Sequence, residues 1–226
     1  FFTLGGHSLL AAQLTYRLNS RFDAGLSMRA VFEGPTVAQL AAFIEESPAA
    51  ATEHRECIAR LSDQSRAPAS VMQERLWLLE QLNPGRVVYH TPSAHRLTGA
   101  LQEDAFQRAF DTVVSRQPSL RTDFDNHRHG LDQRVHDNVS VSLIPVEDLS
   151  HVPYPEREAL LRQRLDELTA ETFDLSCAPL FKVRMFRLED EEHVFFFMPH
   201  HIIWDGWSFD LLYHEMSELY AAYAAG

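Results

Sequence analysis

Cysteine, positive charge and long apolar runs are all scarce in this sequence. Its two cysteines, Cys57 and Cys177, lie far apart, so we expect neither a disulfide framework nor a cysteine-rich zinc site. A formal net charge of -12 argues against nucleic acid as a partner, because phosphate binding needs a basic face. The apolar run at 194–198 is far too short to cross a bilayer, and the first residues do not resemble a signal peptide. We therefore expect a cytoplasmic protein with no membrane partner.

The chain does contain enough apolar material for more than one domain. Its 226 residues, of which 45% are hydrophobic, allow one ordinary domain and a small one. The apolar periodicity is lost between residues 48 and 67, which predicts a linker that could include a helical turn at 57–61. As a flexible coil, this linker would span roughly 25 Å and let a small domain swing over its neighbour. The predicted domains are thus 1–47 and 68–226.

The first candidate site is Ser8, within the opening ten residues FFTLGGHSLL. Leucines recur every four residues from Leu10 to Leu18, which predicts a helix that begins at about Ser8. The free amides and positive end of that helix would favour a phosphodiester on Ser8, while Gly5 and Gly6 would leave a modifying enzyme room to approach. Serine also caps helices routinely, and spacing alone does not separate the two roles.

The second candidate site follows three phenylalanines, in the stretch MPHHIIWDGWS at 198–208. The phenylalanines would be buried on both faces of a central strand, so His200 and His201 would emerge at the carboxyl edge of a sheet. Consecutive residues point in opposite directions, so only one imidazole can face a given cleft. A neutral imidazole can accept a proton from an attacking amine. Asp205 could hold the loop by an ion pair or orient a ring, and Gly206 would let backbone or substrate approach closely.

The same side chains allow other interpretations. A histidine pair at the end of a strand often has only a structural role. His200, His201, Asp205 and His214 could also bind zinc, but the sequence offers no cysteine partner and no His-Glu-x-x-His spacing. We therefore expect no metal site.

Helices and strands alternate from residue 68 onward, which predicts an open sheet flanked by helices in an α/β layered domain. Helices are expected at 71–82, 102–116, 155–169 and 209–223. Strands are expected at 88–97, 119–125, 134–136, 139–144, 180–188 and 193–198, with a hairpin turn at 189–191.

The pattern around Ser8 resembles the carrier domain of nonribosomal peptide synthetases, whose motif is roughly F-F-x-L-G-G-H/D-S-L. The stretches RAVFE at 29–33 and PTVAQL at 35–40 are similar to the short third helix and the last helix of this small all-α helical bundle, and Thr36 would cap that last helix. The resemblance implies that Ser8 carries 4'-phosphopantetheine, which a phosphopantetheinyl transferase attaches from coenzyme A. The family's first helix would precede Phe1, so the carrier at 1–47 is expected to be incomplete.

Three further stretches resemble the condensation domains of the same synthetases. HHIIWDG at 200–206 is similar to H-H-x-x-x-D-G, SVMQERLW at 70–77 to S-x-A-Q-x-R-L-W, and RQPSLRTDF at 116–124 to R-H-x-x-L-R-T-x-F. The resemblance implies that 68–226 is the first lobe of a two-lobed fold like that of chloramphenicol acetyltransferase. This lobe alone is expected to be inactive, because the family's active site lies between two lobes.

The resemblance also implies roles and a reaction. His201 corresponds to the catalytically important histidine, Asp205 to an acidic residue that keeps the site's shape by a salt bridge, and His200 to a structural histidine. Backbone amides near Gly206 are candidates to stabilise an oxyanion. The amine of an acceptor aminoacyl thioester would attack the donor aminoacyl or peptidyl thioester held on Ser8, and a peptide bond would form. The implied partners are an upstream adenylation domain and a downstream acceptor carrier domain.

Finer features of the motifs bear on the reaction. In the family that the chain resembles, carriers that precede epimerisation domains tend to have GGDS, so the GGHS found here implies an L-configured donor. The start of the second domain also lacks an additional H-H-x-x-x-x-G-D stretch, which disfavours an enzyme that both epimerises and condenses. Two alternatives stay open: an epimerisation domain, which shares H-H-x-x-x-D-G, and a non-catalytic carrier or interaction module.

The sequence departs from the condensation pattern at three positions. Gln117 stands in place of a histidine, Met72 in place of an alanine and Trp204 in place of a small residue. Trp204 either narrows the acceptor side of the site or packs in the core, and core packing is favoured.

Overall fold

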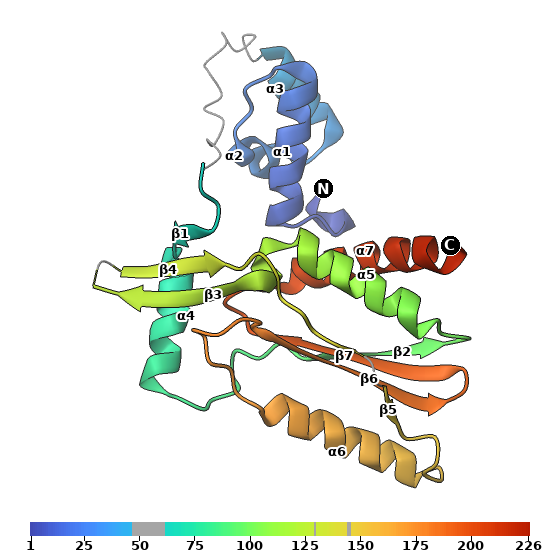
Figure 1. Cartoon of the computed structure of the whole chain (residues 1–226). Coiled ribbons are helices and arrows are strands. Elements are labelled where there is room, and N and C mark those ends of the chain that lie inside the picture. Colours follow the sequence, from blue (N-terminus) through green and yellow to red (C-terminus); the bar gives the residue numbers. More distant parts are fainter. Residues whose placement is uncertain (47–61, 129, 144–145) are drawn as a thin grey trace. The chain divides into compact units, whose positions relative to one another are not determined.

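The computed structural model describes residues 1–46, 62–128, 130–143 and 146–226, and the chain divides into two compact units, Phe1–Arg60 and Leu61–Gly226 (Figure 1). The helical turn predicted at 57–61 and most of the predicted linker lie outside the described residues. No helix formed by the described residues is both long and apolar enough to cross a membrane.

The described part of the first unit is helical around a small core. A short 3₁₀ turn, η1 (Phe2–Leu4), precedes α1 (Ser8–Phe22), α2 (Met28–Glu33) and α3 (Val37–Glu46). The buried residues Ala11, Val31 and Leu40 form the core. The helix predicted to begin at about Ser8 is confirmed. Thr36 caps α3 as expected, because its Oγ1 accepts a hydrogen bond of 3.3 Å from the backbone N–H of Gln39.

The described part of the second unit has two sheets, where the sequence predicted one. The larger sheet has the order β2-β7-β6-β5, formed by Ser93–Thr98, Glu192–Pro199, Phe181–Glu189 and Glu147–Asp148. Its neighbouring strands are antiparallel except β5 and β6, which are parallel. The smaller antiparallel sheet has the order β1-β4-β3, formed by Arg66–Pro68, Gly130–Val135 and Thr122–His127. The first two residues of strand β1 lie in the predicted linker, 48–67.

Several predicted strands were wrong in extent. The strand predicted at 88–97 begins only at Ser93, and residues 118–121 form a 3₁₀ turn, η2 (Pro118–Arg121), before β3. Residues 139–143 form no strand. Their backbone instead bonds a side chain of a helix: Gln107 donates to the Val141 carbonyl at 3.0 Å and accepts from the Leu143 N–H at 2.7 Å. These bonds satisfy groups that a sheet would otherwise pair.

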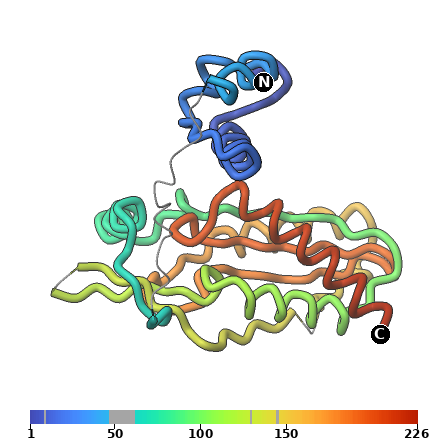
Figure 2. Tube along the Cα trace, turned by 90° about the horizontal axis from the view of Figure 1, so that it is seen from above, coloured from blue at the N-terminus to red at the C-terminus, as the bar shows by residue number. Residues whose placement is uncertain are grey.

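The four predicted helices are confirmed within three residues at each end. They are α4 (Val71–Leu82), α5 (Glu103–Arg116), α6 (Glu156–Ala170) and α7 (Gly206–Ala225). Helices α5 and α7 run side by side over one face of the larger sheet, and α6 covers the other (Figures 1 and 2). The unit therefore has the layered α/β architecture that alternating helices and strands predicted.

Strand β7 is one of the two inner strands of the larger sheet, and its side chains alternate between two cores. Phe195 and Phe197 belong to the core that includes residues of α5 and α7, whereas Phe196 and Met198 belong to the core that includes residues of α6. This period of two is that of a strand buried on both faces, as predicted. Burial on both faces fixes the register of β7, and with it the position of the histidines that follow.

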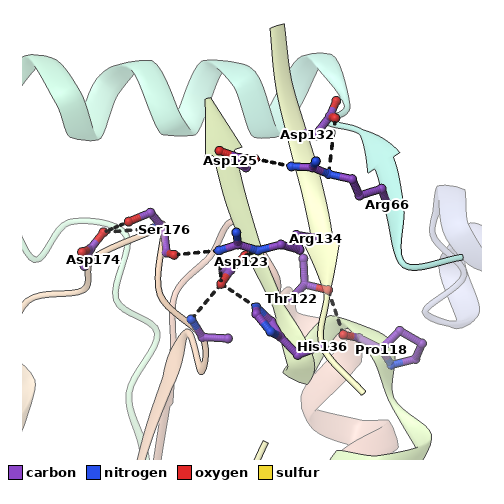
Figure 3. A network of polar contacts seen from close by, with 11 residues as sticks. Arg66, Pro118, Thr122, Asp123, Asp125, Asp132, Arg134, His136, Asp174 and Ser176 are labelled. Atoms are coloured by element: carbon purple, nitrogen blue, oxygen red, sulfur yellow. Dashed lines mark hydrogen bonds and ion pairs between the residues drawn. The ribbon is translucent and has the colours of Figure 1, made fainter. Parts of the chain in front are cut away.

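A polar network anchors the smaller sheet to the loop before β6 (Figure 3). Asp123 of β3 is 1% exposed and accepts hydrogen bonds from Arg134 Nε at 2.9 Å, His136 Nε2 at 2.6 Å and the Ala178 N–H at 3.2 Å. Burial alone would raise the pKa of Asp123, but the bonds from Arg134 and His136 outweigh it and hold the pKa below its ordinary value. The charged carboxylate is thus the form that the fold stabilises.

Candidate functional site

Ser8 is exposed at the first position of α1. The N-cap residue of this helix is His7, and no side chain caps it by a hydrogen bond. The Ser8 hydroxyl has no hydrogen-bond partner among the described residues. The capping role that the sequence allowed for Ser8 is therefore not used, and the hydroxyl is available at the helix N-terminus.

Gly5 and Gly6 have local structural roles beyond the access that the sequence suggested. Gly5 ends η1 with φ 91°, a left-handed conformation that other residues rarely adopt. A Cβ on Gly6 would lie 2.5 Å from the ring of Phe1, so any side chain there would force that ring to move. The two glycines therefore shape the turn that leads into α1.

His200 is fully buried behind the end of β7. Its Nδ1 accepts a hydrogen bond of 3.1 Å from the Ile202 N–H, so its Nε2 carries the proton that faces Glu80 Oε1 at 3.2 Å. Burial lowers the pKa of His200, and the bond to Glu80 only partly opposes it. These contacts support the structural role expected for His200.

His201 is exposed, so the adjacent imidazoles do lie in opposite environments. Its backbone N–H donates to the Tyr89 carbonyl at 2.8 Å, and its Nδ1 lies 2.6 Å from the Trp204 carbonyl oxygen. A carbonyl can only accept, so Nδ1 carries the proton and Nε2 of the neutral ring keeps a lone pair. The ring is thus held in the tautomer whose Nε2 can accept a proton.

Asp205 is the N-cap residue of α7. Its Oδ1 accepts hydrogen bonds from the Ser208 N–H at 2.9 Å and the Ser208 hydroxyl at 2.6 Å. The Ser208 hydroxyl is the main reason why the pKa of Asp205 lies below its ordinary value, and nearby His201 adds to the effect. Asp205 forms no ion pair with the described residues and does not orient the ring of His201. Within this structure it shapes the site by capping the helix, and the salt bridge expected for Asp205 stays a prediction.

Gly206 is the first residue of α7 and is exposed. A Cβ placed on it would have no atom of another residue within 4 Å. No described residue therefore makes the close approach that the sequence suggested for Gly206, and the space beside it is open.

Trp204 and Gln117, two departures from the family pattern, are both accounted for by packing or hydrogen bonding. Trp204 is 7% exposed and packs edge-on against Phe197 and Phe209, with ring centroids 5.2 and 5.5 Å away. Gln117 Nε2 donates to Glu215 Oε1 at 2.8 Å. The favoured core role of Trp204 is consistent with these contacts.

The described residues include no group of three or more histidine, cysteine, aspartate or glutamate side chains that could hold a metal ion. His200 is bonded to Glu80, while His201 is exposed and bonded to a backbone carbonyl. The zinc interpretation therefore finds no support in the geometry of the two histidines.

Two residues that contact the histidines were missed by sequence reasoning: Glu80 and Tyr89. Glu80 is separated from His200 by 120 positions, and neither Glu80 nor Tyr89 belongs to a motif. Nothing in their spacing could have indicated contacts that only the packing of the chain creates.

Comparison with known proteins identifies the two units by family. Residues 63–226 match the family model of the condensation domain, and residues 1–44 match that of the phosphopantetheine attachment site. The chain therefore belongs to the condensation-domain family. Its condensation domain is preceded by a carrier domain that takes 4'-phosphopantetheine. These matches favour condensation over the epimerisation alternative.

The chain is similar to curated multidomain synthetases. It is 39% identical over 223 residues to one of the linear gramicidin synthase subunits of Brevibacillus parabrevis, and 37% identical over 222 residues to cyclosporin synthetase simA of Tolypocladium inflatum. These alignments cover 99% and 98% of this chain but only 4% and 1% of those relatives. The chain thus combines a carrier and a condensation domain of the nonribosomal peptide synthetase type.

Solved structures agree with the family. The starter condensation domain of rhizomide synthetase RzmA matches with a TM-score of 0.64 and 26% identity, covering 71% of this chain and 38% of that one. The X-domain in a complex with OxyB from teicoplanin biosynthesis matches with a TM-score of 0.66 and 29% identity, covering 76% of this chain and 36% of that one.

Proposed function

We propose that Ser8 is the residue that carries 4'-phosphopantetheine, on a small helical carrier domain that spans residues 1–47. Three features support it: the hydroxyl is exposed, it lacks a partner among the described residues, and it opens a 15-residue helix. The unpaired N–H groups of the first turn and the positive end of the helix dipole would stabilise a phosphodiester there. When bound, the group supplies a thiol that holds an aminoacyl or peptidyl chain as a thioester.

Attachment is tested by intact-mass measurement after the 226-residue chain is incubated with coenzyme A and a phosphopantetheinyl transferase. We expect a mass gain of one phosphopantetheine in the wild type and none in Ser8→Ala. Ser20→Ala is the matched control, because Ser20 is also exposed on α1, and it should load like the wild type. A gain that survives Ser8→Ala would place the attachment elsewhere.

The proposed reaction of the second domain, over residues 68–226, is peptide-bond formation. The amine of an acceptor aminoacyl thioester attacks the carbonyl of the donor thioester, and His201 Nε2 accepts the amine proton. As the C–N bond forms, the C–S bond of the donor breaks, and the departing thiolate takes up that proton to leave a free thiol. The observation that supports this role is the bond from Nδ1 to the Trp204 carbonyl, which leaves a lone pair on Nε2 of an exposed side chain. Proton transfer of this kind typically contributes about 10²–10⁴-fold, and alignment of the two thioesters contributes further.

The neighbouring groups have supporting roles. The Ser208 amide already donates to Asp205, so the amide of Gly206 is the better candidate to stabilise the developing oxyanion. His200 stabilises the turn that follows β7, because its ring bonds both Glu80 and the Ile202 N–H.

The proposed partners follow from the carrier–condensation order. They are the transferase that loads Ser8, an upstream adenylation domain, a downstream acceptor carrier and the two thioester substrates, with an L-configured donor. Residues 48–67 would link the domains, and a second lobe would complete the active site. Because coenzyme A supplies the prosthetic group, we propose a cytoplasmic location.

Condensation is tested in a chain extended to both lobes of the family's fold, loaded with donor and acceptor thioesters. His201→Ala should lower the rate of dipeptidyl product formation by about 10²–10⁴-fold. His214→Ala, an exposed histidine on α7, is the matched control and should keep the wild-type rate. Unchanged turnover in His201→Ala would exclude this role for His201.

A further inference from the structure

Two side chains that line one small cavity between η2 and α7 each carry a buried polar atom without a partner among the described residues. The Trp204 Nε1–H and Glu215 Oε2 are buried, and neither has a hydrogen-bond partner among the described residues. Both side chains line the cavity, as do those of Gln117, Ser119 and Ser208. Buried polar groups in folded proteins are nearly always paired, so two unpaired atoms on one cavity require an explanation.

The size and chemistry of the cavity suit a neutral molecule that can both accept and donate. About 50 Å³ is open to the centre of a water-sized molecule, and a buried water needs roughly 10–15 Å³ on that scale. The indole N–H can only donate and the carboxylate oxygen can only accept. The N–H disfavours a cation and the carboxylate disfavours an anion, whereas water accepts from the first and donates to the second.

We propose that a bound water bridges Trp204 Nε1 to Glu215 Oε2, and that Glu215 thereby acts as a positioning residue for His201. The other oxygen of the same carboxylate, Oε1, accepts a hydrogen bond of 2.8 Å from Gln117 Nε2. This bond fixes the carboxylate on the η2 side, so Oε2 is presented to the cavity in one orientation. Glu215 and the water then add to the contacts with Phe197 and Phe209 that hold the indole ring.

The bridge reaches His201 through Trp204 alone. The indole ring and the carbonyl that accepts the proton of His201 Nδ1 belong to the same residue. The intervening chain is a tight turn, in which the Ile203 N–H donates to the His200 carbonyl at 3.1 Å. By anchoring the side chain of residue 204, the bridge restrains the backbone of this turn, and with it the carbonyl that accepts from His201 Nδ1.

The network is specific to this chain's own residues. Gln117 and Trp204 are two of the positions at which the sequence departs from the usual condensation pattern, and both line this cavity. A small residue at position 204 would have no N–H to offer Glu215. Gln117 and Trp204 therefore belong to the same proposed network around Glu215.

The bridge is tested by NMR on the ¹⁵N-labelled 226-residue chain. The sequence has three tryptophans, so the loss of one indole signal in Trp204→Phe assigns Trp204. In the wild type we expect this indole N–H to show magnetisation transfer to a long-lived water, and the ring nitrogens of His201 to report a proton on Nδ1. In Trp204→Phe, which keeps an aromatic ring but removes the donor, the tautomer of His201 should shift toward the Nε2-protonated form.

Glu215→Leu should abolish the water contact and shift the tautomer in the same direction. Glu218→Leu is the matched control, because Glu218 is exposed on the same helix, and both signals should stay as in the wild type. If Glu215→Leu does not fold, Trp204→Phe still decides the question. A wild-type indole without a long-lived water, or a tautomer unchanged in Trp204→Phe, would overturn the proposal.

The water bridge does not depend on the proposed function. Only the catalytic use of His201 Nε2 rests on it. The NMR measurements need neither thioester, so their failure would leave the expected effect of His201→Ala standing. Conversely, a chain without condensation activity could still show the water bridge.

Discussion

The surroundings of Ser8 and of His201 differ in how much of the chain is needed to build them. Ser8 opens a helix after a turn formed by residues 1–7, and the core beneath that helix consists of three buried side chains. His201 is held by a carbonyl from Tyr89, a carbonyl from Trp204 and a buried neighbour that contacts Glu80.

The difference follows from what each side chain must do. An attachment point needs only to present a reactive oxygen to another enzyme, and a helix N-terminus does so with residues adjacent in sequence. A proton acceptor needs one tautomer and one orientation, which require partners on the far side of the ring. We therefore expect loading of Ser8 to tolerate damage to the second unit.

The variant Phe197→Ala, for which we expect the largest effect, tests this comparison. Phe197 is fully buried and contacts the rings of Phe110, Phe181 and Trp204. Its truncation should lower the free energy of unfolding of the second unit by about 3–5 kcal/mol, through lost burial and the cavity that remains. Chemical denaturation followed by tryptophan fluorescence measures this loss, because Trp77, Trp204 and Trp207 all lie in that unit.

Mass gain at Ser8 in the same variant should equal that of the wild type. The control is Val71→Ala, since Val71 is 79% exposed, and it should change stability little. Loss of loading in Phe197→Ala but not in Val71→Ala would show that the carrier depends on its neighbour, and the comparison would fail.

A smaller effect is expected from Asp123→Asn, which weakens the polar network of the second unit. We expect a loss of about 2 kcal/mol at pH 7, because hydrogen bonds to a charged group are lost while its partners Arg134 and His136 remain partly exposed to solvent. Urea denaturation at several pH values measures it. Asp137→Asn, at an exposed position nearby, is the control.

The free energy of unfolding that Asp123→Asn loses should decrease as the pH falls. The pKa of Asp123 is lower in the folded state, so its contribution is complete above its ordinary unfolded value of about 3.9 and disappears as the pH falls through the folded value. The difference between wild type and variant should therefore shrink in acid. A difference that is constant with pH would show that the charge of Asp123 contributes nothing.

The smallest expected effect separates two roles of Asp205. Asp205→Ala should cost about 1 kcal/mol through loss of the α7 cap, whereas Asp205→Asn should cost much less because asparagine caps equally well. Thermal unfolding of both variants measures this, with Asp210→Ala on the same helix as the control. If Asn destabilises as much as Ala, the charge of Asp205, rather than its cap, holds the site.

Much of this architecture could be predicted because it depends on local patterns. The four helices of the second unit and strands β6 and β7 followed from apolar periods of 3.6 and 2. The strand expected at 139–144 did not form over its described residues, because Gln107 bonds their backbone. The short pairing of β1 with β4 was also missed, because the three residues Arg66–Pro68 carry no strand signal.

By itself, the sequence determined the position of Ser8 at a helix start, the central strand that ends before the histidine pair, and the family of both units. These features depend on neighbours in the chain and on side-chain periodicity. Only the tertiary structure decided that His200 is buried while His201 is exposed, and that Trp204 selects the tautomer of His201. The physical reason is that burial and hydrogen bonding are set by residues such as Glu80 and Tyr89, which approach the histidines only when the chain has folded.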